Sequence, residues 1–172
     1  MSELETERLK LRYIPAGDAE AIFNNWASDP EVARYVTWCA HESIAVTEQI
    51  MKFWLSEYEK DNCYRYGIER KSDGELMGMI DVVGYHHGNP VIGYCSGRKY
   101  WNNGYMTEAL KAVIAELFSD GYETIVIEAM KDNIGSNRVI EKAGFEFVNC
   151  YKDMISEIKR EEVVFNSYRL RK

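Results

Sequence analysis

The sequence predicts a domain of the mixed α/β class, and three observations lead to it. Stretches with the helical period and stretches with the strand period follow one another along the chain, with no repeat or low-complexity segment between them. The early strand patterns are joined by short turns, as antiparallel neighbours are, whereas helices separate the later ones. The composition, 46% apolar and 28% charged, is that of a globular protein. We therefore expect residues 1–172 to form one domain whose sheet is antiparallel at first and crosses over later.

The first part of the chain predicts one strand, two helices and three further strands. Apolar and charged residues alternate from Leu4 to Ile14, as in a half-buried strand. Asp18 is a candidate N-cap for a helix that ends before Pro30, and a second helix is expected from about Glu42 to Glu59. Three strands joined by short turns follow, over Cys63–Arg70, Glu75–His86 and Val91–Arg98.

Helices and strands alternate in the rest of the chain. Residues 106–118 place apolar side chains at helical spacing, and Gly121 follows as the C′ residue. Thr124–Met130 is almost wholly apolar, which predicts a strand buried on both faces. The remaining elements are expected to be a short helix over Ser136–Ala143 and two strands over Glu146–Ile155 and Glu161–Leu170.

The charge and the cysteines disfavour several classes of protein. Lys and Arg number 21 against 28 Asp and Glu, which gives a net charge of −7. A nucleic-acid-binding protein needs a basic surface, so this class is disfavoured and a cationic partner suits the charge better. The four cysteines lie far apart, without the spacing of a metal site, and are expected to be reduced thiols. With no signal peptide or membrane-spanning run in view, we expect a cytoplasmic protein without a membrane partner.

Two segments can bind or transfer a chemical group. Tyr100–Thr107 places a glycine turn directly before a helix, where free N–H groups and the positive end of the helix dipole favour a phosphate. A plain helix entry with Thr107 as a cap is the alternative. In the second segment, Asn133 can hydrogen-bond an amide of a ligand and Ser136 can donate to a leaving group. Equally, Ser136 is a good N-cap and Asn133 a good turn former.

These two segments and three others, in this order, resemble the GNAT superfamily of acetyl-CoA-dependent N-acetyltransferases. The likeness is to the branch of ribosomal-protein N-terminal acetyltransferases in particular. The fragments are ETERLKLR at 5–12, IGY at 92–94, YWNNGYMTEA at 100–109, NIGS at 133–136 and EKAGF at 141–145. The resemblance implies a mixed, mostly antiparallel sheet of about six to seven strands with splayed central strands, flanked by about four helices. This order of elements matches the one expected from the sequence pattern.

The resemblance also implies where acetyl-CoA binds. Gly104 is the glycine shared with the family's pyrophosphate loop, and Asn133 stands where the family has an asparagine that contacts the cofactor arm. The implied cofactor-binding residues are Tyr94, Cys95 and Ser96 on the splayed strand, Trp101, Asn102, Asn103, Gly104, Tyr105 and Met106 in the loop, Thr107 at the helix start, and Asn133. No metal is implied.

The chain departs from the family pattern at a few positions. Trp101 replaces a Gln or Arg, as is common in this branch, and Asn102 stands where the branch often has Gly. Met106 stands where the motif has Gly or Ala, and its bulk would narrow the loop or shift the diphosphate. Many relatives carry a tyrosine that protonates the thiolate of CoA. That position is Ile140 here, so Ser136 is expected to take its place, as in this branch.

The reaction implied is direct attack of a primary amine on the thioester of acetyl-CoA in a ternary complex. Backbone N–H groups of the splayed strand are expected to polarise the carbonyl, and Ser136 to donate to the departing sulfur. Glu128 is the preferred base because it interrupts an apolar strand, where desolvation makes a carboxylate more basic. A structural carboxylate paired with an Arg or Lys is the equal alternative. The other candidate bases are His86, His87, Asp81 and Glu75.

The acceptor is expected to bind between the first two helices and the strand-to-strand loops, with Tyr35 and Trp38 in its wall. A protein N-terminus and a small amine, such as an aminoglycoside, a polyamine or an amino acid, are both left open. An open acidic cleft would favour the peptide, and a closed pocket the small amine. Another class, a non-catalytic acyl-CoA sensor, is kept open by Ile140, Met106 and the absence of a clear base. Both a monomer and a homodimer are compatible with the sequence.

Overall fold

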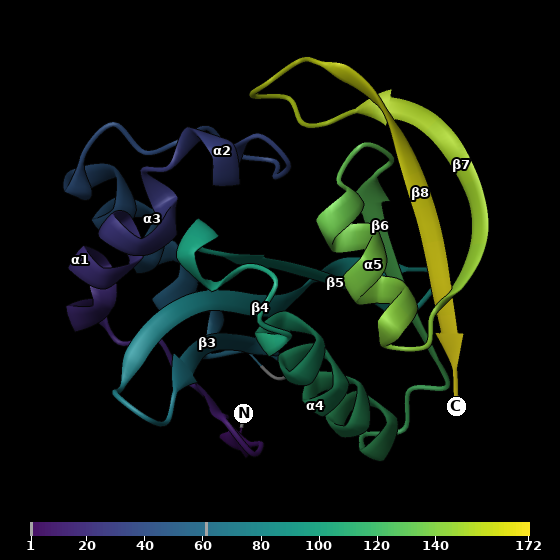
Figure 1. The fold of residues 1–172 in the computed structure, drawn as a ribbon, viewed down its shortest axis with the longest axis horizontal. Coiled ribbons are helices and arrows are strands. Elements are labelled where there is room, and N and C mark those ends of the chain that lie inside the picture. The colour runs from purple at the N-terminus through teal and green to yellow at the C-terminus, as the bar shows by residue number, and fades with distance from the viewer. Residues whose placement is uncertain (1, 61) are drawn as a thin grey trace.

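The core of the molecule is an eight-stranded sheet with the strand order β1-β2-β3-β4-β5-β6-β8-β7 (Figure 1). This computed structural model describes residues 2–60 and 62–172. The strands are β1 (Leu4–Glu5), β2 (Leu9–Arg12), β3 (Arg65–Arg70), β4 (Glu75–His86), β5 (Asn89–Ser96), β6 (Thr124–Met130), β7 (Glu146–Met154) and β8 (Glu162–Arg171). The helices are α1 (Ala19–Ile22), α2 (Pro30–Ala33), α3 (Ile44–Glu57), α4 (Tyr105–Ser119) and α5 (Ile134–Lys142).

The middle of the sheet is split. From β1 to β5 all neighbours are antiparallel, as are β6, β8 and β7, and the two halves are joined by the parallel pair β5 and β6. This pair is in register only at Val91↔Val126 and Ile92↔Ile127. Beyond Ile92, β5 stays paired with β4 as far as Ser96, while β6 stays paired with β8 as far as Met130. The carboxyl ends of β5 and β6 therefore diverge, which confirms the predicted splayed central strands.

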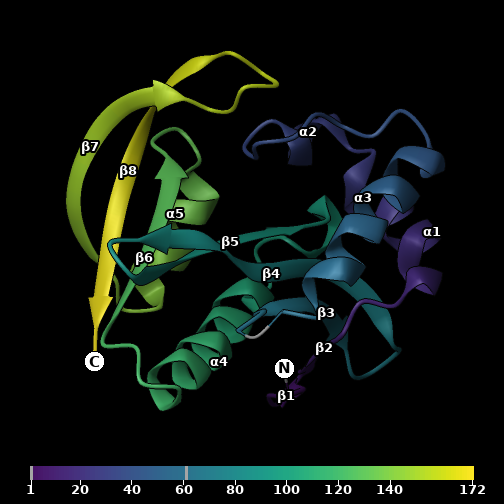
Figure 2. The same cartoon turned by 180° about the vertical axis from the view of Figure 1, so that it is seen from behind.

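Helices cover both faces of the sheet. α4 and α5 pack on one face, in a core that includes Leu110, Ile127 and Ile140. α1, α2 and α3 pack on the other face, around Trp26, Met51 and Met79 (Figure 2). α4 and α5 therefore lie on one side of the splay between β5 and β6, and α1, α2 and α3 lie on the other side.

Several predicted elements differ from the structure at short segments. The strand predicted over Leu4–Ile14 is wrong in its middle, where Thr6 N–H donates to the Leu9 carbonyl and turns the chain into the β1–β2 hairpin. This turn accounts for the eighth strand. α2 was not predicted; Asp29 caps it by accepting from the Glu31 N–H, and Pro30 occupies its first turn.

Two helix starts differ from the predicted capping: Asp18 stands at the N-cap position of α1 without a side-chain bond, and Ser136 is not the N-cap of α5. Asp18 precedes α1 but makes no capping hydrogen bond, because its carboxylate lies 2.7 Å from the Arg12 guanidinium instead. Around it the chain passes through a 3₁₀ turn, Ala16–Asp18, and a π-helical turn, Phe23–Ala27. At the second site the helix begins at Ile134, and the cap is Asn133, whose side-chain oxygen accepts from the Ser136 N–H at 3.1 Å.

Candidate active site

The loop before α4 leads into a helix whose amino terminus has no side-chain capping bond among the residues described. Gly104 is the N-cap, with a left-handed φ of 79°, and no side-chain capping bond closes the first turn among the residues described. Asn102 is left-handed as well, with φ 61°. In a helix of 15 residues, the amides of the first turn lack intrahelical acceptors and lie at the positive end of the dipole. These open donors fit the diphosphate of a CoA molecule.

Side chains of the loop fold back to hold it in shape. The Asn103 amide donates to the carbonyls of Tyr100 and Trp101, at 3.2 and 2.8 Å. The Trp101 indole N–H donates to the carbonyl of Ser96 at 2.9 Å, which ties the loop to the end of β5. Asn103 and Trp101 therefore shape the loop through bonds of their own side chains, and the main chain remains available to a ligand.

Arg8 of the amino-terminal hairpin braces the same loop. Its Nε lies 2.7 Å from Glu108 in the first turn of α4, and its Nη1 donates to the Asn103 carbonyl at 3.1 Å. Its guanidinium also lies over the Tyr105 ring, 4.5 Å from the centroid. Because the peptide unit is planar and trans, holding the Asn103 carbonyl toward Arg8 turns the Gly104 N–H the opposite way.

Glu108 is the anchor of this brace. Its carboxylate accepts from the Thr6 hydroxyl at 2.5 Å and from the backbone and guanidinium of Arg8 at 2.9 and 2.7 Å. Burial acts to raise the pKa of Glu108, but these hydrogen bonds outweigh it and hold that pKa below its usual value. Sequence reasoning assigned Arg8 and Glu108 no role. Both residues stand in fragments shared with the family. They are 100 residues apart in the sequence, so no local pattern shows that they form an ion pair.

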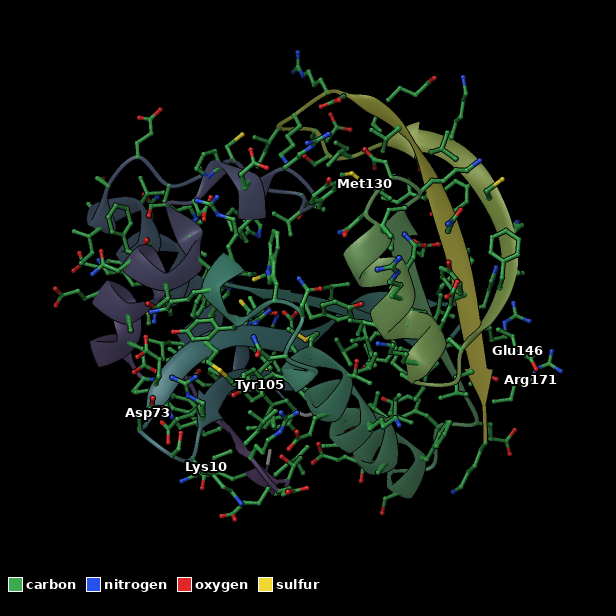
Figure 3. All side chains as sticks on the ribbon, viewed as in Figure 1. Lys10, Asp73, Tyr105, Met130, Glu146 and Arg171 are labelled. Atoms are coloured by element: carbon green, nitrogen blue, oxygen red, sulfur yellow. The ribbon has the colours of Figure 1, made fainter. Side chains whose placement is uncertain are left out.

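Tyr94 and Ser136 meet across the splay. The Tyr94 hydroxyl, from β5, lies 2.9 Å from the Ser136 Oγ and 3.3 Å from the Ser136 carbonyl oxygen, in the first turn of α5. Burial raises the pKa of Tyr94, so its phenol stays protonated. In Figure 3, Tyr105 at the start of α4 and Met130 at the end of β6 lie well apart, on either side of the region where β5 and β6 diverge. The contact between Tyr94 and Ser136 thus links the carboxyl-terminal part of β5 to the predicted segment Asn133–Ser136.

Asn137 fixes the start of α5 against the sheet. Its amide nitrogen donates to the carbonyls of Met130 and Asn133, at 2.9 and 2.7 Å. Its Oδ1 accepts from Asn166 at 2.9 Å and from the Tyr168 hydroxyl at 2.7 Å. Both amide hydrogens and both lone pairs are used, so this buried side chain holds the Ser136 turn in a single position. Sequence reasoning did not identify it.

The other residues expected to bind the cofactor are distributed over both faces of the sheet. Cys95 packs on the α1–α3 core, and burial raises the pKa of its thiol to about 12, so it stays neutral. Tyr105 and Met106 pack, partly buried, against the α4 core, and Thr107 follows in the same helical turn. The contacts expected between Tyr94, Cys95 or Ser96 and the cofactor remain predictions.

The predicted burial of Glu128 is wrong. Its side chain is exposed on β6, on the opposite face from the buried Ile127 and Ala129. It also accepts a hydrogen bond from Tyr151 of β7, whose pKa is raised by burial and by this bond. Strand alternation explains the error: successive side chains point to opposite faces of the sheet, and an apolar run does not show which part of a face the rest of the fold leaves uncovered. Its role as a base remains a prediction, without the desolvation that suggested it.

The other candidate bases lie along β4 and its hairpin. Asp81 is buried against Arg65, with 3.1 Å between Oδ2 and Nε, and burial raises its pKa against the pull of that guanidinium. Glu75 accepts from Lys99 at 2.7 Å and from Tyr100 at 2.5 Å. His86 and His87 are exposed at the hairpin turn. Asp81 stands opposite Gly93 in the β4–β5 register, one residue beyond the last β5–β6 pair.

Tyr35 and Trp38 lie in the irregular segment between α2 and α3. Both are half-buried; the Arg34 guanidinium lies 5.1 Å from the Tyr35 ring centroid, and Trp38 lies 5.4 Å from the His41 ring. Trp38 also packs against the α1–α3 core. Neither of them hydrogen-bonds Tyr94 or Ser136 among the described residues. Their place in an acceptor pocket remains a prediction.

Two cavities lie at the surface near the carboxyl end of α4. Cavities of about 550 and 490 Å³ share Tyr64 and Tyr122, near the carboxyl end of α4. Within residues 2–60 and 62–172, no group of three or more His, Cys, Asp or Glu residues is arranged to hold a metal ion. Over the same residues, no helix combines the length and apolarity needed to cross a membrane.

Comparison with known proteins agrees with this geometry. The model of the acetyltransferase (GNAT) domain matches residues 8–146. The uncharacterized N-acetyltransferase YoaA of Bacillus subtilis is 37% identical over 149 residues, which are 83% of this chain and 82% of that protein. A putative ribosomal-protein-serine acetyltransferase from Vibrio cholerae superposes with a TM-score of 0.86 at 21% identity, over 99% of this chain and 98% of the other.

A second similar structure was solved with acetyl-CoA bound. The Microcin C7 self-immunity acetyltransferase MccE, in complex with acetyl-CoA and AMP, superposes with a TM-score of 0.85 at 18% identity, over 97% of this chain and 94% of the other. At these identities the solved structures establish the fold, whereas the domain match and YoaA establish the family. The predicted fold and family are confirmed: the chain belongs to the GNAT family of acetyltransferases, whose acetyl donor is acetyl-CoA.

Proposed function

We propose that this chain transfers the acetyl group of acetyl-CoA to a primary amine by direct attack within a ternary complex. The acceptor is a protein N-terminal α-amine or a small-molecule amine. One observation carries the proposal: Tyr94 and Ser136 place two hydroxyl groups 2.9 Å apart across the splay. The open helix terminus at Gly104 supports it from the neighbouring loop.

Each part of the site has a role in this reaction. The amides at the start of α4 bind the diphosphate, and the Asn133 side chain lies at the end of the cofactor arm. Acetyl-CoA supplies an acyl group already activated for transfer. The free N–H groups of β5 beyond Ile92 polarise the thioester carbonyl. Ser136 donates a hydrogen bond to the departing sulfur, so the C–S bond breaks to a stabilised thiolate as the C–N bond forms, and the amine loses one proton to water.

The amine decides how much base catalysis is needed. An α-amine has a pKa of about 7.7–8.0 and is roughly one-tenth neutral at pH 7. A lysine-type amine, near 10.4, is neutral less than about once in a thousand molecules. Because no carboxylate hydrogen-bonds Ser136 or Tyr94 among the described residues, an α-amine suits the site better, with water as the proton acceptor.

The setting we propose is the cytoplasm, with the chain acting as a monomer or a homodimer. All four cysteines, Cys39, Cys63, Cys95 and Cys150, are free thiols, as in a reducing compartment. The net charge of −7 suits a cationic acceptor.

The test is release of CoA thiol from acetyl-CoA against a panel of N-terminal peptides, polyamines, amino acids and aminoglycosides. Wild type and Ser136→Ala are compared, with the exposed Cys39 and Cys150 counted as background thiols. We expect turnover with one acceptor class and a loss of about a hundredfold in kcat for Ser136→Ala. Tight CoA binding without turnover on any acceptor would contradict the proposal and favour a non-catalytic acyl-CoA sensor.

A further inference from the structure

Within residues 2–60 and 62–172, the hydroxyl oxygen of Ser136 has a single hydrogen-bond partner. The Asn133 side chain caps the helix by accepting from the Ser136 N–H, so the Ser136 hydroxyl is not used as a cap. Its side-chain contact is with the Tyr94 hydroxyl, at 2.9 Å. A serine hydroxyl carries one hydrogen and can accept as well as donate. The direction in which that hydrogen points is therefore decided by Tyr94.

The Tyr94 hydroxyl has one hydrogen that it can donate to Ser136. A phenol whose ionisation is disfavoured by burial keeps its hydrogen and has to place it on an acceptor. The acceptors in reach are the Ser136 Oγ, at 2.9 Å, and the Ser136 carbonyl oxygen, at 3.3 Å. When the Tyr94 O–H donates to the nearer Oγ, the hydrogen of Ser136 is turned away from Tyr94.

Without that bond, Ser136 has another use for its hydrogen. A serine within the first turns of a helix commonly donates to a backbone carbonyl three or four residues earlier. Here such a carbonyl belongs to Asp132 or Asn133. A hydroxyl bound in this way is not available to a leaving group.

We propose that Tyr94 is a positioning residue for catalysis, donating to the Ser136 Oγ so that the Ser136 hydrogen points into the splay. This inference rests on the proposed role of Ser136 as donor to the departing sulfur. Tyr94 itself gives up no proton in the reaction. Its effect is confined to the step in which the C–S bond breaks, because its ring packs on the α4 core and leaves the diphosphate loop untouched.

The test is a double-mutant cycle of Tyr94→Phe and Ser136→Ala. Tyr94→Phe keeps the ring and removes only the hydroxyl, so we expect kcat to fall about tenfold, the loss of one hydrogen bond at the transition state. The KM for acetyl-CoA should change less than about twofold, because binding of the diphosphate is unaffected. In the Ser136→Ala background, Tyr94→Phe should change kcat by less than about twofold, because the hydroxyl it positions is gone.

Tyr64→Phe is the matched control. Tyr64 is also a buried tyrosine whose hydroxyl donates a hydrogen bond, to the Asp120 Oδ2 at the end of α4 at 2.6 Å. Among the described residues it makes no hydrogen bond to Ser136 or Asn137, so it reports what loss of a structural hydroxyl does. We expect Tyr64→Phe to lower the melting temperature at least as much as Tyr94→Phe, with kcat within about threefold of wild type.

The outcomes separate this inference from the function on which it rests. If Ser136→Ala turns over like wild type, the proposed role of Ser136 fails. If Ser136→Ala is impaired while Tyr94→Phe keeps the wild-type kcat, the positioning role is overturned and the proposed function stands. If Tyr94→Phe is as damaging in the Ser136→Ala background as in wild type, Tyr94 acts on its own and the inference is wrong.

Discussion

The proposed donor side and the proposed acceptor side of the site are built in different ways. On the donor side, the loop before α4 and the start of α5 are held by hydrogen bonds between distant parts of the chain, such as Arg8 to Glu108 and Tyr94 to Ser136. On the acceptor side, Tyr35 and Trp38 lie in an irregular segment, next to the nearby residues Arg34 and His41. A cofactor that does not vary suits a fixed backbone, whereas a variable acceptor suits loops.

The acceptor side is nevertheless tied to the other half of the molecule. Lys159, in the loop between β7 and β8, donates to the carbonyl of Ala33 at the end of α2 and also lies 3.5 Å from the Arg34 carbonyl. Figure 1 shows the β7–β8 hairpin arching over the sheet toward α2. This contact partly buries Lys159, which lowers its pKa. The difference between the two sides therefore predicts which substitutions affect acetyl-CoA and which affect the amine.

The largest effect on acetyl-CoA binding is expected at Gly104. Gly104→Val puts a β-branched side chain at a φ of 79°, which costs about 2 kcal/mol and distorts the loop, a loss of roughly thirtyfold in acetyl-CoA affinity. Calorimetric titration with acetyl-CoA measures it. Gly74→Val is the control, since Gly74 has a φ of 72° in the β3–β4 turn with nothing within 4 Å of an added Cβ. Equal losses of affinity in both variants would refute the donor role of the loop.

Arg8→Met is expected to have the next largest effect. It removes the guanidinium bonds to the Asn103 carbonyl and to Glu108, so the KM for acetyl-CoA should rise about tenfold while kcat at saturation stays near wild type. Arg8→Lys should behave like Arg8→Met, because an ammonium cannot bridge Glu108 and Asn103 together. Lys10→Met, two residues further along the chain and paired with Glu3, is the control. Full rescue by lysine would mean that charge alone matters.

Lys159→Met tests the acceptor side. Loss of its bond to Ala33 loosens the β7–β8 loop, and we expect the KM for the amine to rise about threefold. The Kd for acetyl-CoA should not change, because the donor loop is not touched. Steady-state kinetics with each substrate varied in turn separate the two constants. A weaker Kd for acetyl-CoA would show that the two sides are not independent.

Glu128→Gln is expected to have the smallest effect. The exposed carboxylate has no desolvation to make it a strong base, and it already accepts a hydrogen bond from Tyr151. We expect kcat within about twofold of wild type between pH 6 and 9. A selective loss at the low end of this range would restore Glu128 as the base.

Regular elements with strong local patterns were predicted well. β4 and β6 have the predicted bounds, Glu75–His86 and Thr124–Met130, because an unbroken apolar pattern and clear turns mark both. The short elements were not predicted, since the β1–β2 hairpin and α2 depend on contacts such as Lys71 N–H to the Arg8 carbonyl. Segments of two to four residues carry too little periodicity to be recognised alone.

For the site, the sequence by itself determined the two segments, Tyr100–Thr107 and Asn133–Ser136, because glycine and asparagine have few substitutes where a strand passes into a helix. Only the tertiary structure decided which side chains meet there. Arg8 reaches Glu108 across 100 residues, Tyr94 reaches Ser136 across 42, and Glu128 lies exposed where burial was expected. Pairing and exposure depend on the order of the strands and on the twist between β5 and β6, which no local pattern encodes.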